Sequence, residues 1–136
     1  MKTQKDINDL SFKIIGCAIE VHKHLGPGLL ESVYEACFIE ECRAQGLEVK
    51  SQLWVPVIYK GKNLGRKLKL DVLIEDIIIV ELKAVEVMIP LYQAVLLSYL
   101  KLSDKPKGLL INFNCENISK QMVSLVTDKF STYPKS

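Results

Sequence analysis

Residues 67–84 constrain the fold more than any other part of this chain of 136 residues. Residues 67–74 alternate between polar and apolar side chains, which predicts a strand with one buried face. The run Ile77-Ile78-Ile79-Val80 predicts a second strand over 77–84 that is buried on both faces. Because only Glu75-Asp76 separate them, the two strands must form an antiparallel hairpin. The side chains expected on one face of the first strand are Leu68, Leu70, Val72 and Ile74.

Three charged residues interrupt this apolar hairpin. Asp71 lies within the first strand, and Glu81 and Lys83 end the second. Burying a charge is costly unless the charge is paired or binds a metal. Glu81 and Lys83 share a face because they are two residues apart on a strand. An ion pair with a structural role at the strand end is the alternative explanation for these two residues.

The register of the hairpin decides whether Asp71 meets Glu81. A two-residue turn pairs Asp71 with Val80 and sends its side chain to the opposite face. A three-residue connection, or a bulge, places Asp71 opposite Glu81 instead. Two converging carboxylates repel each other, and a bound Mg²⁺ or Mn²⁺ relieves that repulsion. Lys83 could then orient a water or stabilise developing negative charge. A metal site here therefore requires an odd connection.

The rest of the chain predicts a single α/β domain over residues 1–136. Apolar side chains at three- and four-residue steps predict helices, and Gly26-Pro27-Gly28 separates the first two. Pro56 predicts that its strand is an edge strand or contains a bulge. The expected elements are helices at 7–25 and 30–46, strands at 49–59, 67–74 and 77–84, a buried helix at 90–102, a strand at 108–113 and a final helix around 118–126.

Composition narrows the possible functions only in part. Hydrophobic residues make up 49% of the chain and charged residues 25%, so a mostly disordered chain is excluded. The apolar runs are far shorter than the roughly 20 residues of a membrane span, and the N-terminus lacks a signal-peptide core. We therefore expect a cytoplasmic protein with no membrane partner. The net charge of +2 does not by itself indicate nucleic acid. One basic stretch fits either a solvated hairpin or a phosphate-contacting edge: Lys60, Lys62, Arg66, Lys67 and Lys69.

Glu31 is a further candidate for the site. It lies in the first turn of the second expected helix, three residues after Gly28. A glutamate at the third helical position is favoured by the helix dipole, which would give it a structural role. The functional alternative is an additional carboxylate directed at the metal. Its position along the sequence does not decide between the two.

Residues 28–34, Gly-Leu-Leu-Glu-Ser-Val-Tyr, resemble the G-x-x-E-x-x-Y motif of the bacterial and archaeal GxxExxY proteins. The resemblance continues through Asp71 and through the segments 80–86, 96–101 and 108–113, so that it covers roughly residues 14–126. That family is grouped with the PD-(D/E)xK nuclease superfamily. The resemblance implies an αβββαβ core, in which a mixed four-stranded sheet is flanked by helices, with an extra N-terminal helix.

The resemblance also implies roles for individual residues. Asp71, Glu81 and the backbone carbonyl of Leu82 would bind Mg²⁺ or Mn²⁺, with Glu31 as the acid contributed by a helix. Lys83 would be the catalytic lysine in the hydrolysis of a phosphodiester by an activated water. Three further residues would support this site: Tyr34, Gln93 and Tyr99.

One position departs from the family pattern. Relatives usually carry a glutamine four residues before the helix tyrosine, where this chain has Val95 before Tyr99. Gln93 lies two residues away, about 200° around the helix, so it cannot replace the missing side chain. We therefore expect metal binding to survive and nucleic-acid positioning or turnover to be weakened.

Three functions are compatible with the sequence. The first is a metal-dependent nuclease, with DNA expected over RNA as the substrate. The second is a non-catalytic nucleic-acid-binding module on the same fold, which Val95 and the basic stretch favour. The third is a protein-interaction domain, which the low net charge would suit. Cutting both strands of a duplex needs two sites, so a homodimer is expected, with the first helix as its contact.

Overall fold

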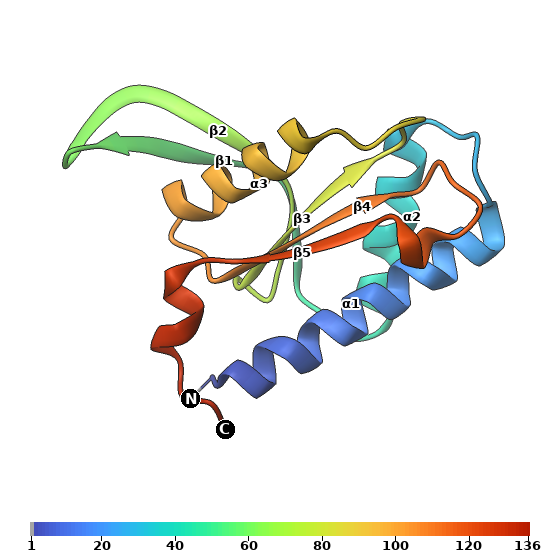
Figure 1. Ribbon diagram of the computed structural model, residues 1–136, viewed down its shortest axis with the longest axis horizontal. Helices are drawn as coiled ribbons and strands as arrows, with labels where there is room; N and C mark the ends of the chain where they lie inside the picture. The colour runs from blue at the N-terminus through green and yellow to red at the C-terminus, as the bar shows by residue number, and fades with distance from the viewer. Residues whose placement is uncertain (1) are drawn as a thin grey trace.

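The computed structural model describes residues 2–136. Its element order is ααβββαββ, with two short 3-10 helices near the C-terminus (Figure 1). The elements are α1 (Gln4–Leu25), α2 (Glu31–Ala44), β1 (Val49–Tyr59), β2 (Lys62–Ile74), β3 (Ile78–Lys83), α3 (Pro90–Leu102), β4 (Lys107–Asn112), η1 (Ile118–Lys120), β5 (Met122–Val126) and η2 (Asp128–Thr132).

The five strands form one open sheet in the order β1-β2-β3-β4-β5. Strands β3 and β4 run parallel because α3 crosses between them, and the other neighbouring pairs are antiparallel. Helices α1 and α2 pack on one face of the sheet and α3 packs on the other, which creates two hydrophobic cores (Figure 1). The α/β architecture with an extra N-terminal helix is confirmed.

The C-terminal element differs from the predicted helix. Residues Met122–Val126 form the edge strand β5, which pairs antiparallel with β4. Val123 and Leu125 point into the core beneath α3, whereas Met122 packs against the core beneath α1 and α2. Apolar spacing over so short a segment does not distinguish a helix from a strand. The sheet therefore has five strands instead of the four predicted.

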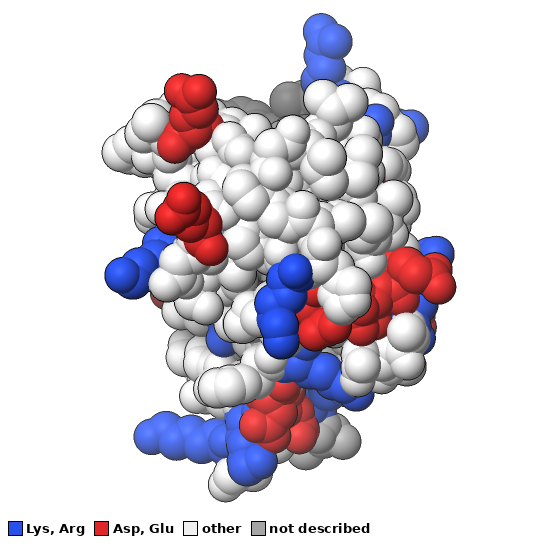
Figure 2. All heavy atoms as spheres, turned by 90° about the vertical axis from the view of Figure 1, so that its right-hand side faces the viewer, with Lys and Arg blue, Asp and Glu red and all other residues white. Residues whose placement is uncertain are grey.

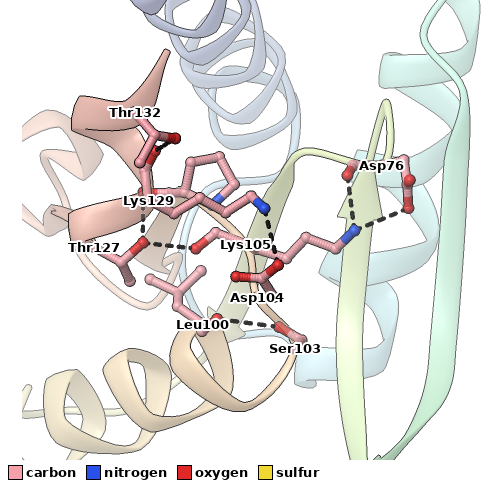
Figure 3. Close-up of polar contacts among 9 residues, drawn as sticks. Asp76, Leu100, Ser103, Asp104, Lys105, Thr127, Lys129 and Thr132 are labelled. Carbon is pink, nitrogen blue, oxygen red and sulfur yellow. Dashed lines mark hydrogen bonds and ion pairs between the residues drawn. The ribbon is translucent and has the colours of Figure 1, made fainter.

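The segment after β5 is fastened to the turn between α3 and β4 (Figure 3). The Thr127 hydroxyl donates to the Lys105 carbonyl at 2.9 Å, and Lys129 pairs with Asp104 at 2.8 Å. Lys105 also reaches Asp76 in the β2–β3 turn at 3.1 Å. Each exposed ion pair contributes little stability alone. Together these contacts tie the end of α3 to the hairpin that carries the candidate site.

Helix α3 is less buried than its apolar sequence predicts. Leu96 and Leu100 are fully buried against the sheet, but Leu91 is 61% exposed and Val95 is 38% exposed. The prediction of a buried helix is wrong because α3 packs on the sheet along one stripe only and keeps apolar side chains on its outer side. None of the helices within residues 2–136 has the length and apolar composition needed to cross a bilayer.

Candidate active site

The β2–β3 hairpin has a three-residue connection, which is the odd connection that a site at Asp71 requires. Ile74 pairs with Ile78, so residues 75–77 form the turn. The first two of these residues have φ values of +53° and +58°, the left-handed conformation typical of tight hairpins. One position beyond the last strand pair of this hairpin, Asp71 lies beside Glu81. The two-residue alternative is excluded.

Asp71 and Glu81 contact each other across the end of the hairpin. The Asp71 N–H donates a long hydrogen bond to Glu81 Oε1 at 3.4 Å. The Leu82 N–H donates to Asp71 Oδ2 at 3.2 Å. The regular β2–β3 pairing ends just before these residues, at the pair between Val72 and Val80. Beyond the last backbone pair, hydrogen bonds from backbone N–H groups to the Asp71 and Glu81 carboxylates therefore join the two strands.

An irregularity in the sheet places Asp71 at this position. Pairing between β1 and β2 skips Gln52, whose φ is +51°. On the two sides of Asp71 the side chains of β2 change face: Val72 packs beneath α1 and α2, whereas Leu70 packs beneath α3 with Leu73. The predicted alternation of side chains over 67–74 is thus wrong at Asp71, because the side chains before and after it lie on opposite faces of the sheet instead of on the same face.

The buried carboxyl group of this pair is Glu81, which is 7% exposed. Burial raises the pKa of Glu81 to about 9, and the adjacent Asp71 carboxylate adds to the shift, while Lys83 opposes it. Two carboxyl groups held this close cannot both ionise without compensation. A proton or a cation between them supplies that compensation.

Helix α2 brings Glu31 toward the same point. Partial desolvation raises the pKa of Glu31, the Asp71 carboxylate raises it further, and Lys83 lowers it. Glu31 is the first residue of α2, with Leu30 as its N-cap, and not the third helical residue that the sequence predicts. The helix begins later because the chain is still turning at Gly28, whose φ is +102°. Its carboxylate therefore lies at the positive end of the helix dipole and also near Asp71.

The turn before Glu31 is fastened by Tyr34, which is fully buried. Its hydroxyl donates to the Gly26 carbonyl at 2.6 Å and accepts the Leu29 N–H at 3.2 Å. Its ring stacks on Phe113, with 4.9 Å between the ring centroids. This geometry explains the spacing of the motif. Gly28 lies in the turn, Glu31 begins the helix, and the Tyr34 side chain hydrogen-bonds to the backbone of the turn.

Glu35 is a residue of this region that sequence reasoning missed. It lies one turn after Glu31, and the Gln52 amide donates to its two carboxylate oxygens at 2.9 and 3.0 Å. Partial desolvation and then the Asp71 carboxylate raise its pKa, against the effects of Gln52 and Lys69. The four-residue spacing from Glu31, which puts both side chains on one helix face, is the signal that identifies it.

Lys83 lies on the face of the sheet that α3 covers. Its Nζ is 4.6 Å from the centroid of the Tyr92 ring. Glu81, Lys83 and three α3 residues, Leu91, Tyr92 and Val95, line a pocket of about 190 Å³. Val95, which stands where the family resemblance leads us to expect a glutamine, thus lines this pocket. Tyr92 was not among the sequence candidates, because one aromatic side chain in an apolar helix gives no distinguishing pattern.

The two remaining predicted supporting residues lie elsewhere on α3. Gln93 is exposed and is not part of the pocket beside Lys83. Tyr99 is partly buried against the core beneath α3, and its carbonyl accepts the Ser103 hydroxyl at 2.6 Å. The structure therefore places Gln93 in solvent and Tyr99 in the packing of the helix.

The basic stretch lies on a two-stranded ribbon formed by β1 and β2, which extends beyond the other strands (Figure 1). Trp54 and Tyr59 are each 58% exposed on this ribbon. Lys69 Nζ lies 5.4 Å from the Trp54 ring centroid, and Lys60 Nζ lies 5.4 Å from that of Tyr59. All five predicted phosphate-contacting side chains are exposed: Lys60, Lys62, Arg66, Lys67 and Lys69.

The carboxyl groups of Asp71 and Glu81 are ligands of the kind that Mg²⁺ prefers. Residues 2–136 contain no cluster of three or more His, Cys, Asp or Glu side chains that could hold an ion by themselves. Mg²⁺ does not require such a cluster, since proteins commonly hold it with one or two carboxylates, waters and substrate phosphates. The contacting carboxyl groups of Asp71 and Glu81 fit that pattern, and their mutual repulsion favours a cation between them.

A family model of the PD-(D/E)XK nuclease superfamily matches residues 8–125. The chain belongs to this superfamily, and its mixed, open five-stranded sheet between helices agrees with that fold. Nucleases of this superfamily typically use divalent metal ions and act on nucleic acid. No curated protein and no solved structure matches the chain significantly. Because one fold can serve several functions, the activity depends on the residues of the site.

Proposed function

We propose that this protein is a metal-dependent nuclease that hydrolyses phosphodiester bonds, with DNA preferred over RNA. The observation that supports this most strongly is the contact between Asp71 and Glu81 with Lys83 on the same strand face. Three charged groups converge there at the end of a buried strand, where charge is costly without a function or a partner. Membership of the nuclease superfamily makes phosphodiester hydrolysis the matching chemistry.

Four groups are proposed as ligands of Mg²⁺ or Mn²⁺. Asp71 and Glu81 would supply carboxylate oxygens, and Glu31, which does not form a three-residue cluster with them in the structure, would approach from α2. The fourth is the carbonyl of Leu82: its N–H points to Asp71, and the N–H and C=O of one strand residue point to the same side. When bound, the ion polarises the phosphate and lowers the pKa of its water.

Lys83 is proposed as the catalytic lysine. Its ammonium lies over the Tyr92 ring, and the side chain lines the same pocket as the buried Glu81. From this position it can orient the attacking water or stabilise the negative charge that develops on the phosphate. The aromatic ring holds the ammonium without neutralising it, since the attraction is to the electrons of the ring face.

The β1–β2 ribbon is proposed as the nucleic-acid contact. Residues 49–70 contain no acidic side chain, so the whole ribbon up to Asp71 is positive. Its exposed lysines and Arg66 can neutralise phosphates, which supplies affinity without sequence specificity. The nucleic acid would thus be bound along the ribbon and cut where the ribbon meets the sheet.

The decisive experiment measures cleavage of duplex DNA, single-stranded DNA and RNA with Mg²⁺ or Mn²⁺. We expect cleavage that requires metal and that Lys83→Ala reduces by at least about 100-fold. The control is Lys23→Ala on α1, an exposed lysine far along the chain from the site, which should cut normally. Unchanged cleavage by Lys83→Ala would show that the site is assigned wrongly.

A nucleic-acid-binding module without catalysis is the second candidate. The observation that favours it is that Val95, found where the family resemblance leads us to expect a glutamine, lines the pocket beside Lys83. Metal binding at Asp71 and Glu81 with no cleavage of any substrate would support this alternative. Val95→Gln should fold normally and should raise activity if an amide at that position positions the substrate.

We also propose that two copies pair when both strands of a duplex are cut. Helix α1 is the proposed contact, and Phe12 on this helix is 80% exposed. Size-exclusion chromatography with light scattering should then give a dimer, and Phe12→Ser should shift it toward monomer. A monomer at micromolar concentration would contradict the proposal.

A further inference from the structure

The pocket beside Lys83 has two chemically different walls. The sheet contributes the charged side chains of Glu81 and Lys83, whereas α3 contributes Leu91, Tyr92 and Val95. Its volume of about 190 Å³ is smaller than the roughly 300–1,000 Å³ of pockets for drug-sized ligands. The pocket therefore has room for a group no larger than a single ring system, with charged side chains on one side of it.

The segments that flank the site expose apolar side chains. Leu30, which precedes Glu31, is 75% exposed, and Val87, between Lys83 and α3, is 68% exposed. Figure 2 shows a broad uncharged area on the end of the molecule that lies at the right of Figure 1. The outer surface of a duplex is dominated by phosphates, which gain little from such side chains. Unpaired bases present ring faces that pack on them.

The ribbon combines the same two kinds of group. Trp54 and Tyr59 expose their rings, and Lys69 and Lys60 lie over these rings at 5.4 Å. Exposed aromatic rings on which bases stack, interleaved with cations for the backbone, are characteristic of surfaces that bind single-stranded nucleic acid. Both the ribbon and the pocket thus carry groups for bases as well as for phosphates.

We infer that the pocket receives one unpaired nucleobase next to the cleaved phosphate, so that the substrate is single-stranded or locally unpaired nucleic acid. The inference rests on the proposed nuclease function only for the position of the phosphate beside Asp71 and Glu81. A base in a paired duplex is stacked within the helix and cannot enter a pocket in the protein wall without leaving its partner. On the α3 wall, Val95 and Leu91 pack on the ring of the base without forming a hydrogen bond that would select one base.

Binding without metal tests the inference independently of cleavage. Affinities are measured in EDTA for a fluorescent oligonucleotide, alone and annealed to its complement. We expect the single strand to bind at least about fivefold more tightly, as one stacked base provides. Val95→Trp, which fills the pocket, should remove that advantage and leave duplex binding unchanged. The control Leu102→Trp adds the same side chain two turns along the same face of α3, outside the pocket, and should bind like wild type.

Equal or tighter binding of the duplex would overturn the inference, as would an equal effect of both tryptophan variants. Leu91→Trp, at a pocket residue that is 61% exposed, is the second filling variant if Val95→Trp does not fold. Single-stranded RNA of the same sequence shows whether the sugar matters.

Cleavage with Mg²⁺ then locates the base relative to the cut. On a single strand with one abasic site, cleavage beside that site should fall about fivefold relative to other positions. Uniform cleavage through the abasic site would contradict a bound base. Absence of any cleavage would refute the proposed nuclease function instead, while the binding experiment would still decide whether the pocket accepts a base.

Discussion

Strand β2 has two halves with opposite surroundings. Residues 72–74 lie in the middle of the sheet, are buried and pair with β1 on one side and with β3 on the other. Residues 62–69 pair with β1 alone, and almost all of them are exposed (Figure 1). Asp71 lies at the boundary, where a buried platform meets an exposed ribbon. One strand therefore carries both the proposed metal ligand and the proposed surface for nucleic acid.

Because of this difference, the buried half of β2 fixes the positions of side chains, whereas the exposed half can supply affinity for a binding partner. A two-stranded ribbon is only marginally stable by itself, so the first half of β2 can adapt to a partner. Metal ligands and a catalytic lysine need positions fixed by packing, which the second half and β3 provide. Changes in the buried half should therefore affect stability and chemistry, and changes in the ribbon should affect binding.

The largest expected contrast is in stability. Leu70→Ala removes a fully buried side chain and should lower the free energy of unfolding by about 2–5 kcal/mol. Leu64→Ala, on the ribbon at 53% exposure, should change it by no more than about 0.5 kcal/mol. Urea denaturation followed by circular dichroism measures both values. Similar losses for the two variants would show that the ribbon is packed in solution.

The next contrast is in metal affinity. Asp71→Asn should weaken Mn²⁺ binding by about tenfold or more, because the amide removes a charge from the proposed pair of ligands. Asp76→Asn, in the turn of the same hairpin, is the matched control and should bind Mn²⁺ normally. Isothermal titration calorimetry gives both affinities. If Asp71→Asn binds like wild type, Asp71 does not hold the ion.

Much of the buried β2–β3 hairpin could be predicted from the sequence, because the patterns that indicate it lie within the hairpin itself. The β-branched run 77–80 and the alternation around it predicted the hairpin, and the breaks in that pattern identified Asp71, Glu81 and Lys83. The need for an odd connection followed from the two-residue period of a strand. The connection itself has three residues.

What could not be predicted depends on distant contacts. The change of face between Leu70 and Val72 lies opposite Gln52, whose backbone is left-handed, and nothing in the sequence near these residues signals it. Whether the outer side of α3 is exposed depends on whether another element covers it. The apolar sequence of the helix therefore could not show that only one side is buried. Tyr92 belongs to the site only because α3 packs beside the end of β3, which brings its ring next to Lys83.

A third prediction concerns the ribbon and salt. Lys67→Ala combined with Lys69→Ala should reduce the slope of log affinity against log salt by about 1.4 for single-stranded DNA, at about 0.7 per phosphate contact. The turnover number at saturating DNA should not change, because neither residue touches the reacting groups. Lys2→Ala with Lys23→Ala removes equal charge elsewhere and serves as the control. An unchanged slope would exclude the ribbon as the phosphate contact.

The smallest effects come from two lysine–aromatic contacts that differ in burial. Lys83 lies over the half-buried Tyr92 ring at 4.6 Å, and Lys69 lies over the exposed Trp54 ring at 5.4 Å. Such contacts are worth about 0.5–1 kcal/mol at exposed sites and more when desolvated. Tyr92→Leu should therefore lower the turnover number by about two- to fivefold, whereas Tyr92→Phe keeps the ring and should restore it.

Trp54→Leu should instead weaken DNA binding and leave the turnover number unchanged, because its ring holds a lysine of the ribbon. Steady-state cleavage kinetics separate the turnover number from the Michaelis constant for all three variants. If Tyr92→Leu and Tyr92→Phe were equally impaired, the hydroxyl and not the ring face would matter. If Trp54→Leu lowered turnover as Tyr92→Leu does, the ribbon would take part in the chemistry, and the separation between the two halves of β2 would fail.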